Sequence, residues 1–333
     1  MRMGGFAGRA LGGRLQRLAA ILVIALIVVG CGRAGEAGGP ASREASASAR
    51  PQTRPEPAVA SSTPVVSVRP AGSGSRRPAT AAPSGRRHRP RSPFASPGLR
   101  AFLASRSGDV TAAVYDARDG RLWVFHPGVR EYTASIVKVE IMGTALQEAQ
   151  QAGQGPPPAE QGLMPSMIED SDNDSATALL HDVGGASAVA RFDRSAGMTD
   201  TEPSSLALIP GTPWPGWGLT TTTARDEVVL VSRFAYPNAV LSGASRQYGL
   251  SLMENVEPGQ AWGVSGGVPP GTTIAVKNGW LPFGANWQID SIGWIDGHGR
   301  DYVLAVLTAA NPGEAYGIDT IEGVASYVYR SAG

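Results

Sequence analysis

Cysteine and lysine are scarce in this chain of 333 residues. Its single cysteine, Cys31, leaves no possibility of an internal disulfide, which excludes the small disulfide-stabilised class of exported domains. Only two of its 29 basic residues are lysines, Lys138 and Lys277. Because arginine serves for ordinary surface charge elsewhere, these two positions indicate a need for an amine with an adjustable pKa.

Charge and composition divide the chain into two parts. Residues 1–97 carry 15 Arg and three Glu, whereas residues 98–333 carry 14 basic and 25 acidic residues. The net negative charge of residues 98–333 argues against nucleic acid as a ligand, because phosphate binding needs clustered basic charge. Residues 32–97 contain almost no large apolar side chain and cannot bury enough surface to fold. We therefore expect a disordered tether over 31–97 and one folded domain over 98–333.

The N-terminus has the pattern of an export signal. Four arginines precede an apolar run of 12 residues, Leu18 to Val29, which is too short to span a bilayer comfortably. The run ends at Val28-Val29-Gly30-Cys31, which resembles the lipobox of bacterial lipoproteins, whose cysteine is lipidated and becomes the new N-terminus. This resemblance implies a signal peptide over 1–30, lipid attachment at Cys31, and a position on the outer face of the cytoplasmic membrane. The alternative is an ordinary secretory signal followed by an unused thiol.

Periodicity predicts the order of helices and strands in the folded part. Strands are expected at 110–115, 122–125, 273–277, 288–295 and 302–308, and helices at 135–149, 173–183, 186–196, from about 222, from about 244, and at 317–329. Strands at both ends with helices between them predict an α+β fold. In it, an antiparallel sheet is formed by the N- and C-terminal segments, and an all-helical lobe is inserted into it.

The first lysine lies in a pattern suited to nucleophilic catalysis. Lys138 follows Ser135 by three residues at the start of a predicted buried helix, and this spacing puts both side chains on one helical face. Burial lowers the pKa of a lysine toward the range where its amine accepts the proton of a serine.

Two further motifs follow along the chain. Ser171-Asp172-Asn173 stands in a polar loop before a helix, and Lys277 ends a predicted strand and is followed by Asn278-Gly279-Trp280. The order S-x-x-K, S-D-N, K-x-G, within residues 99–333, resembles that of class A β-lactamases and penicillin-binding proteins. The resemblance implies the β-lactamase/transpeptidase-like fold and a serine hydrolase that acts through a covalent acyl-enzyme. Its substrate would be a small molecule or a cell-wall peptide, with no metal or cofactor. We expect a monomer.

The resemblance also assigns catalytic roles. Ser135 would be the acylated nucleophile, and Lys138 would help to deprotonate it. Ser171 would relay a proton to the leaving nitrogen, assisted by Lys277. Asn173 would orient the substrate and the lysine head group.

The third motif would bind substrate. Backbone N–H groups of Ser135 and Trp280 would form the oxyanion hole, since Gly279 lets the strand edge approach the substrate. Lys277 would also attract a substrate carboxylate. Asn278 stands where the family usually has Thr or Ser, so we expect its amide to change carboxylate recognition and the preference for β-lactams.

The step after acylation leaves alternatives open. Class A enzymes carry a glutamate between the last two motifs that activates the deacylating water, and Glu202-Pro203 stands in about that place. The loop from Gly197 is short, however, and no Leu-Asn pair follows. Glu202 is therefore either the deacylation base or a solvated loop carboxylate. Beside a β-lactamase-like enzyme, a D,D-peptidase-like enzyme, an esterase and a non-catalytic wall-binding lipoprotein remain as alternatives.

A second nucleophile motif lacks its required context. Gly263-Val264-Ser265-Gly266-Gly267 fits G-x-S-x-G, and Asp290 and His298 follow in the chain order of α/β-hydrolases. The prolines directly after it cannot start the helix that such a motif needs. The four histidines show no metal-ligand spacing.

Overall fold

The computed structural model of the chain describes residues 91–331. The expected signal peptide, Cys31 and residues 31–90 of the expected tether lie outside this range. Within it, no helix has both the length and the apolar character needed to cross a membrane.

The described residues form an α+β structure. Its α-helices are α1 (Pro97–Ala104), α2 (Lys138–Gln151), α3 (Pro158–Glu169), α4 (Asn173–Asp182), α5 (Ala186–Ala196), α6 (Ala224–Ala235), α7 (Gly243–Glu254) and α8 (Glu314–Ser331). Its strands are β1 (Asp109–Asp116), β2 (Arg121–Phe125), β3 (Glu131–Tyr132), β4 (Thr221–Thr222), β5 (Thr273–Phe283), β6 (Asn286–Gly297) and β7 (Arg300–Asn311). Short 3-10 helices are η1 (Pro93–Ala95), η2 (Ala134–Val137), η3 (Gly216–Leu219) and η4 (Pro258–Gln260).

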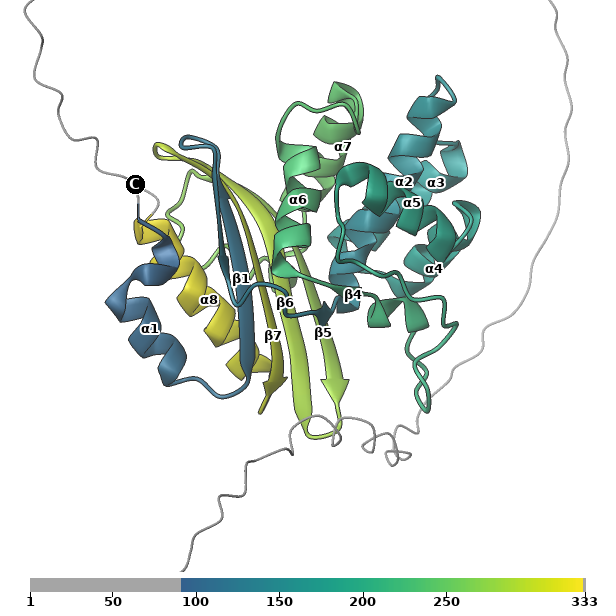
Figure 1. Cartoon of the computed structure of the whole chain (residues 1–333). Coiled ribbons are helices and arrows are strands. Elements are labelled where there is room, and N and C mark those ends of the chain that lie inside the picture. Colours follow the sequence, from purple (N-terminus) through teal and green to yellow (C-terminus); the bar gives the residue numbers. More distant parts are fainter. Residues whose placement is uncertain (1–90, 332–333) are drawn as a thin grey trace, which may run out of the picture. The chain divides into compact units, whose positions relative to one another are not determined.

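Five strands make the main sheet, in the order β2-β1-β7-β6-β5 (Figure 1). All four pairings are antiparallel, and β1 from the N-terminal segment pairs with β7 from the C-terminal one, with Val114 opposite Leu304. This confirms the predicted sheet of N- and C-terminal segments around an inserted set of helices. Strand β5 ends the sheet on the side of the helical lobe, which comprises α2–α7 (Figure 1).

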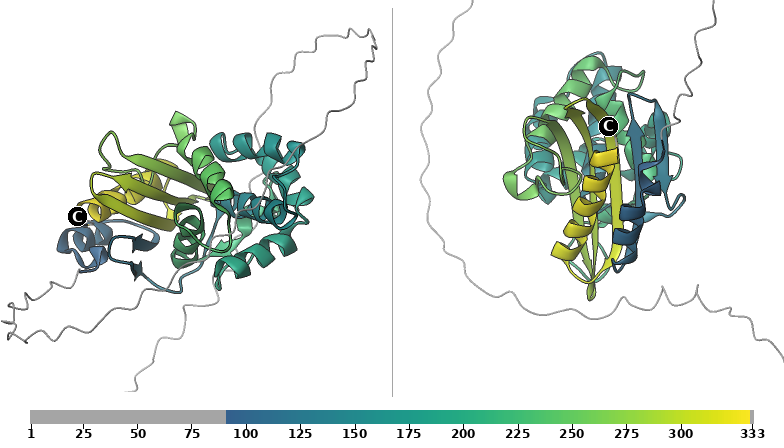
Figure 2. Two further views of the ribbon diagram at one scale, coloured as in Figure 1. Left: turned by 90° about the horizontal axis from the view of Figure 1, so that it is seen from above. Right: turned by 90° about the vertical axis from the view of Figure 1, so that its left-hand side faces the viewer.

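Helices cover both faces of the sheet (Figure 2). Helices α1 and α8 lie on one face, and α6 brings the helical lobe against the other. In β7, Val303, Ala305 and Leu307 belong to the core shared with the lobe. The alternate residues Leu304 and Val306 belong to the core under α8. Side chains of a strand alternate between the two faces, so this double burial explains the nearly continuous apolar run of β7.

The edge strand and the first lobe helix differ from their predicted bounds. Strand β5 continues to Phe283, so Lys277 lies inside the strand and not at its end, because pairing with β6 runs on through Gly279 and Asp290. The predicted helix from Ser135 begins as the 3-10 turn η2, and the α-helix itself starts at Lys138.

Helix α3 is absent from the sequence prediction because its segment contains prolines. Pro158 occupies the first turn, where its missing N–H costs no helical hydrogen bond. Pro165 is inside the helix, a position normally disfavoured. Met164, Met167 and Ile168 are fully buried in the lobe core, and this burial stabilises the helix despite the proline.

The folded part begins before the expected boundary at residue 98. Residues Pro93–Ala95 form η1, and the ring of Phe94 is buried with its centroid 5.8 Å from that of Phe125. The expected tether has almost no large apolar residue apart from Phe94. The burial of this ring fixes the segment around it on the sheet.

Candidate active site

Ser135 lies in a tight turn that joins β3 to the lobe. The turn is η2, and Ala134, directly before the serine, has a φ of +44°, a left-handed conformation that non-glycine residues adopt rarely. Such strain persists only where the surroundings enforce it, and it is common at functional sites. The turn brings Ser135 to the lining of a pocket between the lobe and β5.

Four oxygen atoms surround the side-chain amine of Lys138. Its Nζ lies 3.1 Å from Ser135 Oγ, 2.5 Å from the Ser171 carbonyl, 3.1 Å from Ser171 Oγ and 2.9 Å from Asn173 Oδ1. The carbonyl and the amide oxygen can only accept hydrogen bonds. A neutral amine that donates its two hydrogens to them directs its lone pair at the hydroxyl groups. This is the arrangement needed to take the proton of Ser135.

Ser171 connects the two lysines. It follows α3 with a φ of +57°, and Asp172 caps α4 by accepting a hydrogen bond from Ser175 N at 2.7 Å. Lys277 Nζ donates to Ser171 Oγ at 2.9 Å and to the Asn278 carbonyl at 3.3 Å. All three motifs found in the sequence therefore meet at one place, and Ser171 Oγ stands between the two amines.

Burial sets the charge of both amines. Lys138 is 0% exposed and Lys277 is 1% exposed. Burial lowers the pKa of Lys138 to about 6, and the nearby Lys277 contributes to this decrease. Burial likewise lowers the pKa of Lys277 to about 7, opposed by the charge of Glu257. Near neutral pH, Lys138 is therefore largely the neutral amine that a general base requires.

Gly279 allows β5 to lie directly against the nucleophile turn. A Cβ atom at this position would stand 2.6 Å from the Thr133 carbonyl oxygen and 2.8 Å from Ser135 N. Real Cβ contacts are not this short, and both atoms belong to the backbone, so no side chain can move aside. The glycine of the third motif thus sets the spacing between Ser135 N–H and the strand that carries Trp280.

The Asn278 amide is not turned toward the pocket. This side chain is 1% exposed, and its Nδ2 donates to the carbonyls of Gln260 at 2.8 Å and Trp262 at 3.0 Å. Gln260 Nε2 in turn donates to the Asp170 carbonyl at 3.0 Å, next to Ser171. Asn278 therefore supports the backbone that carries Ser171, whereas the sequence predicted direct substrate contact.

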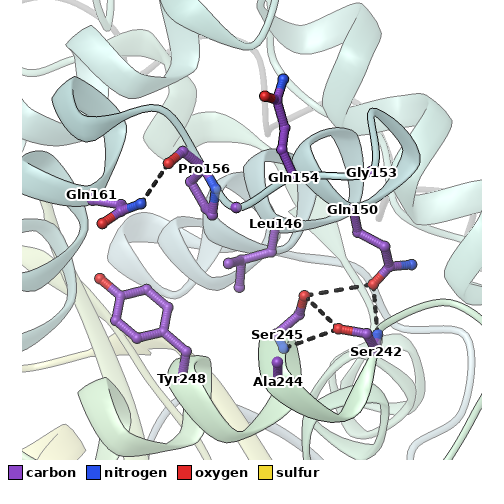
Figure 3. A pocket seen from close by; sticks show the side chains of 11 residues that line it. Leu146, Gln150, Gly153, Gln154, Pro156, Gln161, Ser242, Ala244, Ser245 and Tyr248 are labelled. Atoms are coloured by element: carbon purple, nitrogen blue, oxygen red, sulfur yellow. Dashed lines mark hydrogen bonds between the residues drawn. The ribbon is translucent and has the colours of Figure 1, made fainter. Parts of the chain in front are cut away.

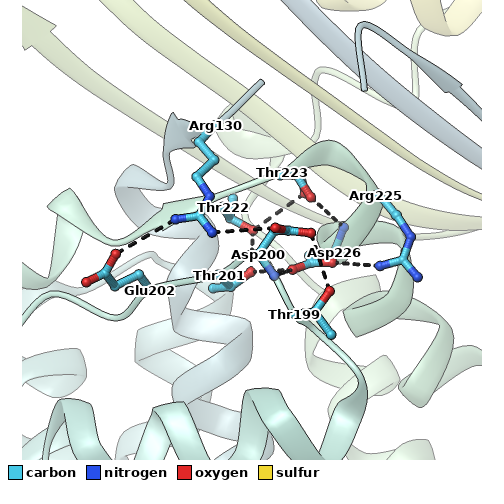
Figure 4. Close-up of polar contacts among 9 residues, drawn as sticks. All are labelled: Arg130, Thr199, Asp200, Thr201, Glu202, Thr222, Thr223, Arg225 and Asp226. Atoms are coloured by element: carbon cyan, nitrogen blue, oxygen red, sulfur yellow. Dashed lines mark hydrogen bonds and ion pairs between the residues drawn. The ribbon is translucent and has the colours of Figure 1, made fainter. Parts of the chain in front are cut away.

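Glu202 is a surface residue paired with arginine (Figure 4). Its backbone pairs with Thr221, and its side chain is 80% exposed, with Oε2 3.8 Å from Arg130 Nη1. Arg130 also contacts Asp200 at 3.5 Å. The lining of the Ser135 pocket contains no carboxylate. This placement gives no geometric support to Glu202 as the deacylation base.

The pocket contains an aromatic wall that the sequence motifs do not reveal. Beside Ser135, Ser171, Asn173 and Trp280, the lining comprises Ala134, Ile209, Trp214, Pro215, Trp217, Gly218 and Leu281. Most of these belong to the 203–219 loop, which folds back on itself through a bridge between Leu208 and Pro215 and ends in η3. The Trp217 ring centre lies 5.0 Å from Lys138 Nζ and helps to exclude water from the amine. The one signal in the sequence is two tryptophans within four residues, 214 and 217.

Other candidate sites lack a catalytic constellation. A larger hollow of about 580 Å³ lies between α2, α3 and α7 (Figure 3), and its lining residues include no Asp, Glu, Lys or His. Ser265 Oγ donates to the Ala261 carbonyl, and Asp290 and His298 have other partners, so the rival motif is not assembled. Among residues 91–331, no group of His, Cys, Asp and Glu is arranged to hold a metal ion.

Three of the carboxyl groups buried in the lobe have raised pKa values. Glu140 of α2, Asp193 of α5 and Glu227 of α6 are at most 1% exposed. Burial and the repulsion of neighbouring carboxylates raise the pKa of Asp193 and of Glu227 to about 8, and raise that of Glu140 well above its ordinary value. Asp193 and Glu227 are therefore largely protonated at neutral pH, and none of the three groups lines the Ser135 pocket.

Comparison with known proteins gives the same fold. A reconstructed class A β-lactamase, the last common ancestor of Gram-negative bacteria, is 22% identical, with a TM-score of 0.60 over 70% of this chain and 97% of that one. A β-lactamase from Xanthomonas campestris pv. campestris is 20% identical, with a TM-score of 0.60 over 71% and 98%. No curated protein matches the chain.

A family model matches just over half of the chain. It is described as the β-lactamase enzyme family and matches residues 160–332. The matched region includes Ser171 and Lys277 but begins after Ser135 and Lys138. These two residues are placed in the site by the hydrogen bonds of Lys138 Nζ. With this match and the class A fold, the chain belongs to the β-lactamase enzyme family and is a serine hydrolase of the β-lactamase type.

Proposed function

We propose that this chain hydrolyses an amide or ester through an acyl-enzyme on Ser135, with Lys138 as the general base. The observation that carries the proposal is the contact set of Lys138 Nζ. Two obligate acceptors take its hydrogens, while its lone pair is left for a hydroxyl proton 3.1 Å away at Ser135.

The chemistry follows from these contacts. Ser135 Oγ attacks the scissile carbonyl, and its proton passes to the lone pair of Lys138 Nζ. When the tetrahedral intermediate collapses, the bond to the leaving nitrogen or oxygen breaks, and the leaving atom takes the hydroxyl proton of Ser171. Ser171 regains a proton from one of the two lysines that contact its Oγ. Water then hydrolyses the Ser135 ester.

Deacylation is expected to be the slow step. A water molecule needs a base beside the ester, and no carboxylate lines the pocket. This favours a slowly deacylating enzyme, as in the D,D-peptidase-like alternative, over a rapidly turning-over β-lactamase.

A covalent label tests the proposal. The full chain treated with a fluorophosphonate or an activated ester should gain one adduct, mapped by mass spectrometry to the peptide that contains Ser135. Ser135→Ala should abolish the adduct, because no other hydroxyl in the pocket has both a lysine partner and a place beside the Gly279 strand contact.

Two variants serve as controls for this experiment. Glu202→Ala should acylate and deacylate at the wild-type rate, and Ser265→Ala should label normally. An adduct on Ser265 would contradict the proposal, as would undiminished labelling of Ser135→Ala. Normal acylation of Glu202→Ala followed by slower deacylation, so that the acyl-enzyme accumulates, would instead restore Glu202 as the deacylation base.

We also propose export and a lipid anchor at Cys31 on the outer face of the cytoplasmic membrane, supported by the apolar run that ends at this cysteine. Wild-type protein should partition into the membrane fraction with a diacylated N-terminal cysteine, and Cys31→Ala should be released or left unprocessed. A neighbouring control, Gly32→Ala, should stay anchored. Wild-type protein recovered in soluble form, beginning at another residue, would contradict the anchor.

A further inference from the structure

We infer that the Ser135 pocket selects substrates whose acyl group is apolar and uncharged, and that the 203–219 loop provides this selectivity. The inference rests on the proposed acyl-enzyme function, since it names the substrate class of that site. It is carried by the composition of the lining, which includes no charged side chain, and by the exposed apolar side chains on the segments that form it.

The lining contains few polar side chains and no charged one. None of its eleven residues has a charged side chain, and its polar side chains other than tryptophan are Ser135, Ser171 and Asn173. The two serines and Asn173 surround the Lys138 amine, where the leaving atom must receive its proton. The acyl group therefore extends toward the remaining, apolar part of the pocket.

That apolar part starts directly beside the nucleophile. Ala134, the neighbour of Ser135, packs with Ile209 and Leu281 in a small apolar cluster. Trp214 and Pro215 complete this side of the lining. The enclosed space is small, about 70 Å³, so only a few carbon atoms of a chain are accommodated inside.

Apolar surface continues outside the pocket. Of the seven large hydrophobic side chains that are exposed in the described part of the chain, five lie on the segments that form the lining: Tyr132, Leu206, Leu208, Trp214 and Phe283. Leu206 and Leu208 belong to the 203–219 loop, and the rings of Tyr132 and Phe283 stack 5.4 Å apart. Clustered exposed apolar side chains of this kind mark binding surfaces. Because these side chains lie on the same segments as the lining residues, we expect a chain that leaves the pocket to meet apolar surface.

No cationic side chain lines the part of the pocket that would hold the acyl group. Lys277 is buried, hydrogen-bonded to Ser171 and to the Asn278 carbonyl, and the Asn278 amide is bound to the 260–262 backbone. Arg130 lies with Asp200 and Glu202. Moving a carboxylate into an apolar pocket without a partner is costly, so the same features that favour apolar acyl groups disfavour anionic ones.

A series of p-nitrophenyl esters measures the selectivity. With the full chain, kcat/KM should rise about two- to fourfold for each added methylene from acetyl through butyryl to hexanoyl, because each methylene leaves water. A terminal carboxylate on an acyl group of matched length should lower kcat/KM by at least about tenfold. Ile209→Ala and Trp214→Ala should flatten the chain-length series. Leu208→Ala, which removes an exposed side chain of the same loop and keeps the backbone, tests the apolar surface outside the pocket in the same way.

Leu122→Ala is the matched control, since Leu122 is also exposed but lies on β2, at the opposite edge of the sheet. It should keep the wild-type series. If wild type acylates Ser135 but shows a flat series, or prefers the carboxylate-bearing ester, the inference is overturned and the proposed function stands. If no ester acylates Ser135, the proposed function itself fails.

Discussion

Lys138→Met is expected to slow acylation of Ser135 by about 10²- to 10⁴-fold, the range typical of a lost general base. Methionine has a similar length and tolerates burial, so the pocket keeps its shape while the lone pair that faces Ser135 Oγ is removed. Burst kinetics with an activated ester measure the rate, and thermal unfolding verifies that the variant is folded.

Lys138→Arg separates charge from basicity. A guanidinium carries a permanent positive charge and offers no lone pair near neutral pH, so this variant should be about as slow as Lys138→Met. Acylation within threefold of wild type in a folded Lys138→Met protein would show that Lys138 is not the base.

Gly279→Ala is expected to reduce acylation by about 10²- to 10³-fold, as the loss of an oxyanion-hole donor does. The added methyl group would stand 2.8 Å from Ser135 N and 2.6 Å from the Thr133 carbonyl oxygen, so β5 and the nucleophile turn must separate. The same overpacking should lower the free energy of unfolding by about 1–3 kcal/mol.

A second glycine provides the control for this variant. Gly162 lies in α3, and a Cβ atom there would meet nothing within 4 Å. Gly162→Ala should therefore keep full acylation and gain stability, because alanine is the better helix former. Equal acylation rates for Gly279→Ala and wild type would contradict the role assigned to this strand contact.

The chemical core of the site is predictable from the sequence because it depends on local spacing and on residue scarcity. Ser135 and Lys138 are three residues apart, which fixes their proximity in any helical turn. The restriction of lysine to positions 138 and 277 distinguishes both amines by composition alone. The three-residue motif at Ser171 has turn and capping chemistry, and the structure confirms that Asp172 caps α4.

The walls of the pocket are not predictable for an equally physical reason. The sequence of the 203–219 loop shows no helical or strand periodicity. Apart from the short helix η3, its structure depends on the Leu208 to Pro215 bridge and on contacts with distant segments. The direction of the Asn278 amide depends on Gln260 and Trp262, which lie 18 and 16 residues away in the sequence. Glu202 matches a family pattern in chain order, but chain order does not specify whether a loop carboxylate points at a serine or at Arg130.

The most direct test of the central claim is the pH dependence of single-turnover acylation of Ser135. Lys138 accepts a proton only when neutral, and burial lowers its pKa to about 6. Protonation below that pH removes the lone pair, so the wild-type rate should fall as pH decreases through about 6 and should level off above it. Lys138→Met should lose this step. A wild-type rate that is unchanged from about pH 5 to about pH 8 would contradict the account, and so would the same step retained in Lys138→Met.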